Sequence, residues 1–305
     1  MIRNSSTFRT LCVGLTFFLT LLISSPLITL AFYLDSAAFS PAIDSASSDG
    51  LDSAPAPDHP DAYYLAENNM ELPPGDQPFY DTLTVAERQA GNLPTQLPVL
   101  PPYYGEKVVY LTFDDGPDPQ NTPEVLQILK DNGIKATFFV VGTQVEKFPD
   151  VLQMVYQDGH AIGNHSYNHI YRQLYQSPAS YTGQLHRTDE IIKNVIGVRP
   201  HISRAPGGSV GSFTKAYWEL LKQEGYLEEG WNVSSGDASS AKAEQLVGNI
   251  VYQMDNKFLW SHAIVLMHDG SGHGETVKAL PEIIKFFKEH GFTFRVINAQ
   301  TPPPW

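Results

Sequence analysis

The later two thirds of the chain alternate between short apolar runs and helical patterns, and this alternation restricts the fold more than any other feature. Residues 108–113 form a largely apolar run, typical of a strand buried on both faces. We predict further strands at 136–141, 160–164, 201–205, 229–233, 263–267 and 292–297, and helices at 123–132, 144–157, 179–196, 212–224, 242–256 and 275–289. Alternating β and α elements predict a parallel sheet, and about seven such units predict a distorted (β/α)7 barrel.

The N-terminus carries a long uncharged run. Residues 11–34 are 24 residues without a charge, and as a helix they would span roughly 36 Å, enough for a hydrocarbon core of ~30 Å. Arg3 and Arg9 precede the run and Asp35 follows it, which predicts a cytoplasmic N-terminus and an extracytoplasmic remainder. We therefore expect residues 1–34 to form a single-pass membrane anchor, or, if they are cleaved as a signal peptide, the rest to be secreted.

Residues 35–104 are rich in proline and acidic residues and are expected to be a disordered linker. Eleven acidic side chains and one arginine, Arg88, lie between residues 35 and 100, so this stretch carries most of the net charge of −13. The folded domain is expected at 105–300. No basic patch indicates nucleic-acid binding, and a lone cysteine, Cys12, excludes an internal disulfide.

Polar clusters follow the predicted strands, at the ends where α/β barrels build their active sites. Asp114 and Asp115 come directly after the first strand. His165 and His169 are spaced so that on a helical turn they share one face and could chelate one metal ion. A carboxylate from another strand end would complete an Asp-His-His site with open positions. No glutamate stands between the histidines as in His-Glu-x-x-His, which argues against a thermolysin-like protease.

Three more clusters follow later strands. Arg204 precedes Ala-Pro-Gly-Gly, where an arginine could clamp a carboxylate bidentately and a glycine backbone could approach a ligand closely. The fourth cluster runs from Trp231 to Ala238, and the fifth is a buried strand ending in His268. Each cluster alone also fits an ordinary turn or loop, so the combination carries the interpretation.

In this order the five clusters resemble the motifs of the polysaccharide deacetylase family, which is the NodB homology domain or carbohydrate esterase family 4. The similarity covers about residues 107–298 and rests on Thr-Phe-Asp-Asp at 112–115, His-Ser-x-x-His at 165–169 and Leu-x-His at 266–268. The resemblance implies a metal-dependent hydrolase that removes N-acetyl groups from an amino-sugar polysaccharide. The expected substrate is a polymer just outside the membrane. In a bacterium, we expect that polymer to be peptidoglycan.

The resemblance also implies roles for the residues at the first three clusters. Asp115, His165 and His169 would bind the metal. We expect Zn²⁺, and a His-His-carboxylate site also suits Co²⁺, Ni²⁺ or Fe²⁺. Asp114 would be the general base, held and polarised by Arg204.

The later clusters would supply the remaining groups. His268 would be the general acid, oriented by Asp237. Gly207 would offer its backbone N–H to the oxyanion, at a position where the family often has tyrosine. Leu266 and Trp231 would line the substrate pocket.

One departure from the family pattern affects the fourth cluster. The family usually reads Asp-x-x-Asp-Trp there, and this chain has Ser234 and Ala238 in place of the first aspartate and the tryptophan. We expect a wider site and an altered substrate preference. The alternatives are an O-acetyl esterase acting on xylan-type glycans and a chitin-oligomer deacetylase. A tethered, non-catalytic wall-binding module is a third, disfavoured because the expected metal and catalytic residues are all present together.

Overall fold

The computed structural model describes residues 59, 61–72 and 74–304, all of which belong to one unit, Asp52–Trp305. Among these residues no helix is both long and apolar enough to cross a membrane. The apolar run 11–34 and the first part of the expected linker, 35–58, lie outside the described residues.

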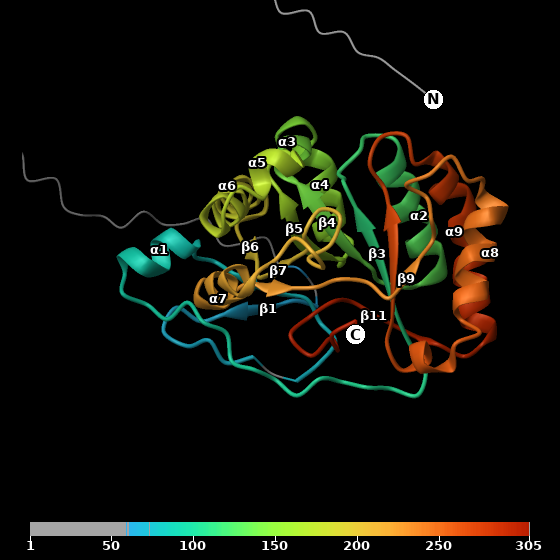
Figure 1. Ribbon diagram of the computed structural model, residues 1–305, viewed down its shortest axis with the longest axis horizontal. Coiled ribbons are helices and arrows are strands. Elements are labelled where there is room, and N and C mark those ends of the chain that lie inside the picture. Colours follow the sequence, from blue (N-terminus) through green and yellow to red (C-terminus); the bar gives the residue numbers. More distant parts are fainter. Residues whose placement is uncertain (1–58, 60, 73, 305) are drawn as a thin grey trace, which may run out of the picture. The chain divides into compact units, whose positions relative to one another are not determined.

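A curled parallel sheet forms the centre of the fold (Figure 1). Its strands follow the order β8-β7-β5-β4-β3-β10-β9, and β11 pairs with β3 beside that path. The bounds are β3 Val108–Asp114, β4 Thr137–Val141, β5 Ala161–Ser166, β7 Ile202–Ser203, β8 Leu227–Glu228, β9 Val233–Ser234, β10 Ala263–His268 and β11 Thr293–Arg295. The sheet curls into a half-barrel, which fits the expected distorted barrel of alternating β and α elements.

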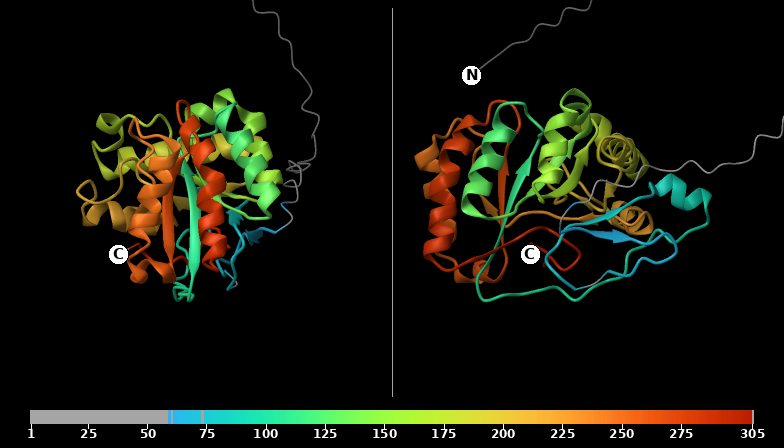
Figure 2. Two further views of the ribbon diagram at one scale, coloured as in Figure 1. Left: turned by 90° about the vertical axis from the view of Figure 1, so that its right-hand side faces the viewer. Right: turned by 180° about the vertical axis from the view of Figure 1, so that it is seen from behind.

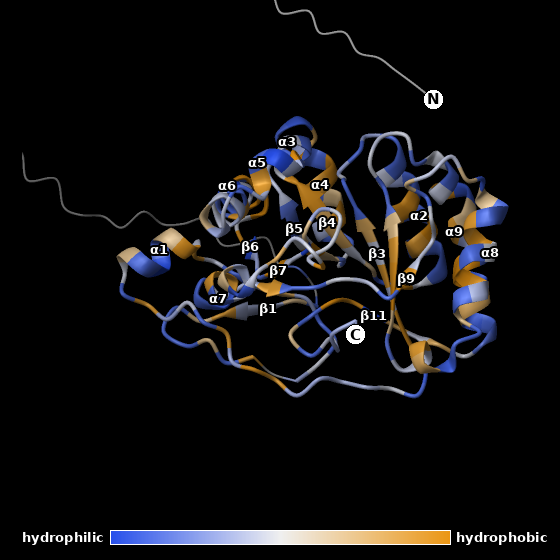
Figure 3. Cartoon of the chain, in the orientation of Figure 1, coloured by the Kyte–Doolittle hydropathy of each residue, from blue (hydrophilic) through white to orange (hydrophobic). Residues whose placement is uncertain are grey.

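Helices cover the outer face of the sheet, as the views from the side and from behind show (Figure 2). They are α2 Asn121–Asn132, α3 Gly142–Lys147, α4 Pro149–Gln157, α5 Tyr171–Leu174, α6 Pro178–Ile196, α7 Lys215–Gln223, α8 Ala243–Gln253 and α9 Gly274–Glu289, with a 3-10 turn at Lys257–Ser261. Hydrophobic residues concentrate on the central strands and on the helix faces that meet them (Figure 3). The largest buried cluster, with Leu111, Val140 and Phe287 among its members, fills this layer.

Two predicted elements are each divided in the structure. The helix predicted at 144–157 is α3 and α4, separated at Phe148. Pro149 is the first residue of α4. Because a proline lacks the N–H that a continuing helix needs, α3 does not run on into α4. The strand predicted at 229–233 is replaced by β8 and β9, which pair with β7 and β10 at opposite ends of the strand order. Among the described strands, β8 and β9 do not pair with each other, so the sheet does not close there.

The described part of the expected linker, 61–72 and 74–104, is folded, and the prediction of a disordered linker is wrong for it. It contains β1 (Tyr63–Leu65), β2 (Phe79–Asp81) and α1 (Val85–Ala90). β1 pairs in parallel with β2, and β2 pairs antiparallel with β6 (Arg199–Pro200) of the main domain. Tyr80 is fully buried in the main hydrophobic cluster. The segment is therefore an integral layer of the domain.

A buried ionic cluster holds this segment in place. Arg88, the lone arginine of the acidic stretch, donates from Nε to Asp81 Oδ2 at 2.6 Å and from a terminal nitrogen to Oδ1 at 2.9 Å. Arg199 donates to the same carboxylate at 3.1 Å, and His201 Nε2 lies 3.3 Å from it. Burial alone would raise the pKa of Asp81, but the hydrogen bonds from His201 and Arg88 outweigh it and lower that pKa. The carboxylate therefore stays charged between its partners.

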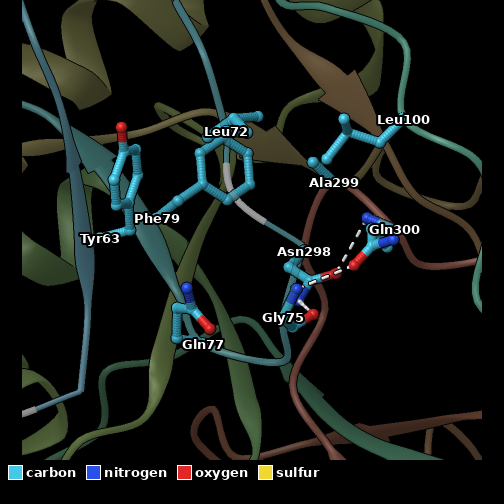
Figure 4. Close-up of a pocket in the computed structure, with 9 residues that line it drawn as sticks. All are labelled: Tyr63, Leu72, Gly75, Gln77, Phe79, Leu100, Asn298, Ala299 and Gln300. Atoms are coloured by element: carbon cyan, nitrogen blue, oxygen red, sulfur yellow. Dashed lines mark hydrogen bonds between the residues drawn. The ribbon is translucent and has the colours of Figure 1, made fainter.

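The segment also binds the C-terminal stretch. Asn298 donates to the carbonyl of Gly75 at 2.9 Å, and the amide of Gly75 donates to Gln300 at 2.9 Å (Figure 4). These residues line a small pocket together with Tyr63, Leu72, Gln77, Phe79, Leu100 and Ala299. None of the expected catalytic residues lines it, so we regard it as a packing junction between the two ends of the domain.

Candidate active site

The five polar clusters meet at the carboxyl ends of the parallel strands, as the strand pattern predicts. Asp114 ends β3, His165 lies near the end of β5, and His268 ends β10. Arg204 directly follows β7, and Asp237 follows β9 by three residues. Because parallel strands end at one edge, side chains far apart in sequence are brought to a single face.

Asp115, His165 and His169 form a compact cluster of possible metal ligands. Asp115 Oδ1 lies 3.5 Å from His165 Nε2 and 3.3 Å from His169 Nε2, and the three ligand atoms are all within 4.8 Å of one another. His165 is buried, whereas the side chains of Asp115 and His169 are 30% and 31% exposed, so the cluster opens toward solvent. This is the geometry of a three-ligand site with free positions.

The donors of this cluster fit a divalent metal ion. Asp115 Oδ1 is buried and forms no hydrogen bond with any described residue. His165 Nδ1 lies 2.8 Å from the carbonyl of Arg204. A carbonyl can only accept, so Nδ1 carries the proton and Nε2 is left with a lone pair for a metal. Burial lowers the pKa of His165 to about 3, which keeps the ring neutral.

The two histidines do not share a helical turn, so that prediction is wrong. His165 belongs to β5, whereas His169 lies in the loop before α5 with φ of 56°, in the left-handed region. Asp115 has φ of 75°. Non-glycine residues are uncommon in this region, and such backbone strain tends to occur at functional sites. The amide of His169 donates to Ser166 Oγ at 3.1 Å, which fixes the loop.

Asp114 is buried beside the cluster and paired with Arg204. A guanidinium nitrogen of Arg204 donates to Asp114 Oδ1 at 2.9 Å, and His165 Nε2 lies 3.8 Å from Oδ2. Contrary to the expected bidentate clamp, only one arginine nitrogen reaches the carboxylate. The others donate to the carbonyls of Glu229 and Gly230. Burial raises the pKa of Asp114 and Arg204 opposes that rise, which suits a carboxylate that accepts a proton.

His268 is held by Asp237 on the other side of the site. Its Nδ1 lies 2.9 Å from Asp237 Oδ1, while its amide and the Thr276 hydroxyl both donate to Oδ2 at 2.7 Å. In register, His268 is the strand partner of Asp114. Burial alone would lower the pKa of His268, but the hydrogen bond to Asp237 and the charge of Asp114 outweigh it and raise that pKa to about 9.

This arrangement predicts the titration of His268. Its pKa is raised above the ordinary value of ~6.5, so the protonated ring adds stability below that pH, and this contribution is lost as the pH rises through about 9. In metal-free Asp237→Asn the midpoint should move down, because the anionic partner is gone. NMR titration of the imidazole C–H signals in metal-free protein tests this. Equal midpoints in the two proteins would contradict a role for Asp237 in setting the pKa of His268.

The residues that are expected to form the substrate pocket lie on β10 or in the loops that follow β7 and β8. Gly207 follows Arg204 closely and has φ of 72°, a conformation that favours glycine. The indole of Trp231 approaches Gly208, where an added Cβ would lie 3.1 Å from it. Leu266 lies on β10, two residues before His268, and is nearly buried. Ala238 is exposed, and the wider site expected from it stays a prediction.

His273, which none of the five motifs includes, also lies at the site. The side chain of His273 is only 19% exposed, and its ring stacks on that of His268 with centroids 4.8 Å apart. Its Nδ1 lies 3.9 Å from Asp237, so these three residues also form a group that could hold a cation. Asp237 already accepts three hydrogen bonds, which favours a positioning role. Only the short spacing from His268 could have suggested this contact.

Comparison with known proteins relates the chain to a class of hydrolases. Residues 103–228 match the family model described as polysaccharide deacetylase. The chain is 32% identical over 204 residues to a peptidoglycan-N-acetylglucosamine deacetylase of Bacillus cereus, covering 65% of this chain and 72% of that protein. It is 30% identical over 201 residues to a chitooligosaccharide deacetylase of Bradyrhizobium, covering 62% and 88%.

A solved structure gives the same result. A CE4 esterase of Streptococcus mutans superposes with a TM-score of 0.60 at 32% identity, covering 64% of this chain and 87% of that one. The fold and the site thus define a carbohydrate-active hydrolase. The chain belongs to the polysaccharide deacetylase family.

Proposed function

We propose that this protein hydrolyses N-acetyl groups on the amino sugars of peptidoglycan and releases acetate. One observation carries the proposal: Asp114 and His268 occupy paired positions on β3 and β10 beside the cluster of Asp115, His165 and His169. Amide hydrolysis needs one group that removes a proton from water and another that gives a proton to the leaving nitrogen. The two paired residues can divide these tasks.

The residues of the chain act in a definite order. Asp114, ionised beside Arg204, accepts a proton from the water that attacks the acetyl carbonyl. The backbone N–H of Gly207 donates to the acetyl oxygen as negative charge gathers there. His268, protonated and oriented by Asp237, gives its proton to the sugar nitrogen when the C–N bond breaks. The products are acetate and a free amino sugar.

A divalent metal would be held by Asp115, His165 and His169, and it would polarise the acetyl carbonyl and lower the pKa of water. We propose Zn²⁺, because neutral imidazole and carboxylate ligands in an open three-ligand set are typical of catalytic zinc. Co²⁺, Ni²⁺ and Fe²⁺ accept similar ligands, so metal analysis of the isolated protein tests this choice.

The surroundings of the site support a polymeric substrate. A cavity of about 780 Å³ borders Gly207 and Gly208, and its lining includes Trp218 and Trp231. Aromatic faces of this kind suit the apolar faces of sugar rings. We further propose that residues 11–34 anchor the chain in the membrane, with the domain outside the cell, on the basis of the charges of Arg3, Arg9 and Asp35 that flank the run.

Acetate release tests the proposed reaction. The full-length, metal-loaded protein in detergent is incubated with peptidoglycan, chitin oligomers and acetylated xylan, and acetate and new free amines are measured by mass spectrometry. We expect acetate and amines in equal amounts from peptidoglycan, and the mass of the amino sugar identifies glucosamine or muramic acid. Acetate from xylan alone would instead identify an O-acetyl esterase, and no acetate from any of the three would contradict the proposal.

A further inference from the structure

Tyr171 lies at the edge of the candidate active site, although no sequence motif includes it. It is the first residue of α5, two residues after His169, and its side chain is half exposed. Its ring centroid lies 5.4 Å from that of His169. Its side chain therefore reaches the face that carries the candidate metal ligands.

The hydroxyl of Tyr171 lies against Gly207. A Cβ placed on Gly207 would be 2.9 Å from the tyrosine oxygen and 3.2 Å and 3.3 Å from two ring carbons, Cε1 and Cζ. The phenol edge thus occupies the space that a side chain at position 207 would need. A hydroxyl group from the start of α5 therefore stands next to the glycine whose N–H is expected to meet the acetyl oxygen.

The neighbouring tyrosine fixes the position of this ring. Tyr175 stacks on Tyr171 with centroids 6.0 Å apart and an interplanar angle of 15°. The Tyr175 hydroxyl donates to the carbonyl of Pro206, the residue before Gly207, at 2.6 Å. The ring of Tyr171 and the backbone of Gly207 are therefore held together through a shared support.

The two hydroxyl groups differ in one decisive way. The hydroxyl of Tyr175 is used in holding the loop, whereas that of Tyr171 has no hydrogen-bond partner among the described residues. A half-exposed phenol has a donor free for a bound molecule. Because it stands beside Gly207 and His169, the molecule it meets is the one that undergoes reaction.

We infer that Tyr171 is a further catalytic residue, whose hydroxyl donates a hydrogen bond to the acetyl oxygen of the substrate alongside the N–H of Gly207. This inference rests on the proposed function. Negative charge gathers on that oxygen in the transition state, so a donor fixed in advance stabilises the transition state more than the bound substrate. No proton is transferred from the phenol, and the balance of the hydrolysis is unchanged.

The variant Tyr171→Phe removes the hydroxyl and keeps the ring stacked on Tyr175. We expect kcat on the acetylated substrate to fall roughly 10- to 100-fold, with little change in KM or in bound metal, as for the loss of one hydrogen bond to a charged group. The matched control is Tyr167→Phe. Tyr167 lies four residues before Tyr171, but its hydroxyl contacts Glu146 and Arg187 away from the site. The control should therefore behave like wild type.

Anion binding gives a second readout that does not need turnover. Methylphosphonate is a tetrahedral anion with the methyl group of the reacting acetyl. Calorimetry on metal-loaded full-length protein should find its Kd about tenfold weaker in Tyr171→Phe than in wild type, as expected for one lost hydrogen bond to a charged group.

Each outcome has a distinct meaning. Unchanged kcat and unchanged methylphosphonate binding would overturn the role of Tyr171 while leaving the proposed function intact. A rise in KM alone would also overturn it, since it would mark a contact with another part of the sugar. If wild type releases no acetate, the proposed function fails, and the anion measurement still decides whether the Tyr171 hydroxyl donates at this position.

Discussion

Asp114→Asn is expected to bind metal normally and to lose nearly all turnover. The asparagine keeps the size of the side chain and can still face Arg204, but it cannot take a proton from water. General-base residues typically contribute on the order of 10² to 10⁴ in rate, so kcat should fall by at least ~10². Metal per chain by elemental analysis and kcat from acetate release are the two measurements.

The matched comparison is His165→Ala, which should lose both metal and activity. His165 Nε2 faces Asp115 Oδ1, and its Nδ1 is committed to the carbonyl of Arg204. Without it only two of the three ligands remain. An Asp114→Asn enzyme with near-normal kcat, or one without metal, would show that the roles of base and ligand have been wrongly divided between Asp114 and Asp115.

A chain that starts at residue 101 is expected to be far less stable than a chain that starts at residue 59. The shorter chain lacks β1, β2 and α1, so Arg199 loses the carboxylate of Asp81 and keeps only that of Asp189, 3.4 Å away, as a buried anionic partner. Removing one partner of a buried ion pair lowers the free energy of unfolding by about 3–5 kcal/mol. In a domain of this size that corresponds to a Tm lower by roughly 6–20 °C, before the lost contacts of Tyr80 are counted.

Thermal unfolding of both chains, followed by circular dichroism, measures this difference. The chain from residue 59 should unfold at the temperature of full-length protein in the same detergent. Asp81→Ala in that chain should also lower Tm, because buried Arg88 and Arg199 then both lose this carboxylate. Equal Tm values for the two truncated chains would mean that residues 59–100 contribute no stability to the domain.

The main sheet and the residues of the candidate active site could be predicted because their signals are local. The apolar runs that end in Asp114 and in His268 each predict a buried strand with a polar residue at its end. The rule that parallel strands end at one face then places these residues together without knowledge of the loops.

Other features depend on contacts that no local pattern records. The strands β1 and β2 have three residues each, too short for a periodic signal, and β2 is held by pairing with Arg199–Pro200 more than 100 residues away. The spacing of His165 and His169 suits a helical turn, but β5 continues through Ser166 and the chain then turns through a left-handed residue. The proline-rich composition of residues 35–104 reflects local backbone preferences. It does not show whether residues far away in the sequence pack against this segment and bury it.

The strand register between β3 and β10 has a consequence for how this protein can vary. Asp114 and His268 are directly opposite each other on hydrogen-bonded neighbours, so their backbones are separated by the interstrand spacing of about 4.8 Å. That spacing is nearly invariant, whereas loop lengths are not. The sheet therefore fixes the separation between the backbones of the two residues that we propose to accept and to donate a proton. The segment between β5 and α6, which carries Tyr171, can be exchanged to suit another glycan while the backbones of Asp114 and His268 keep the same separation.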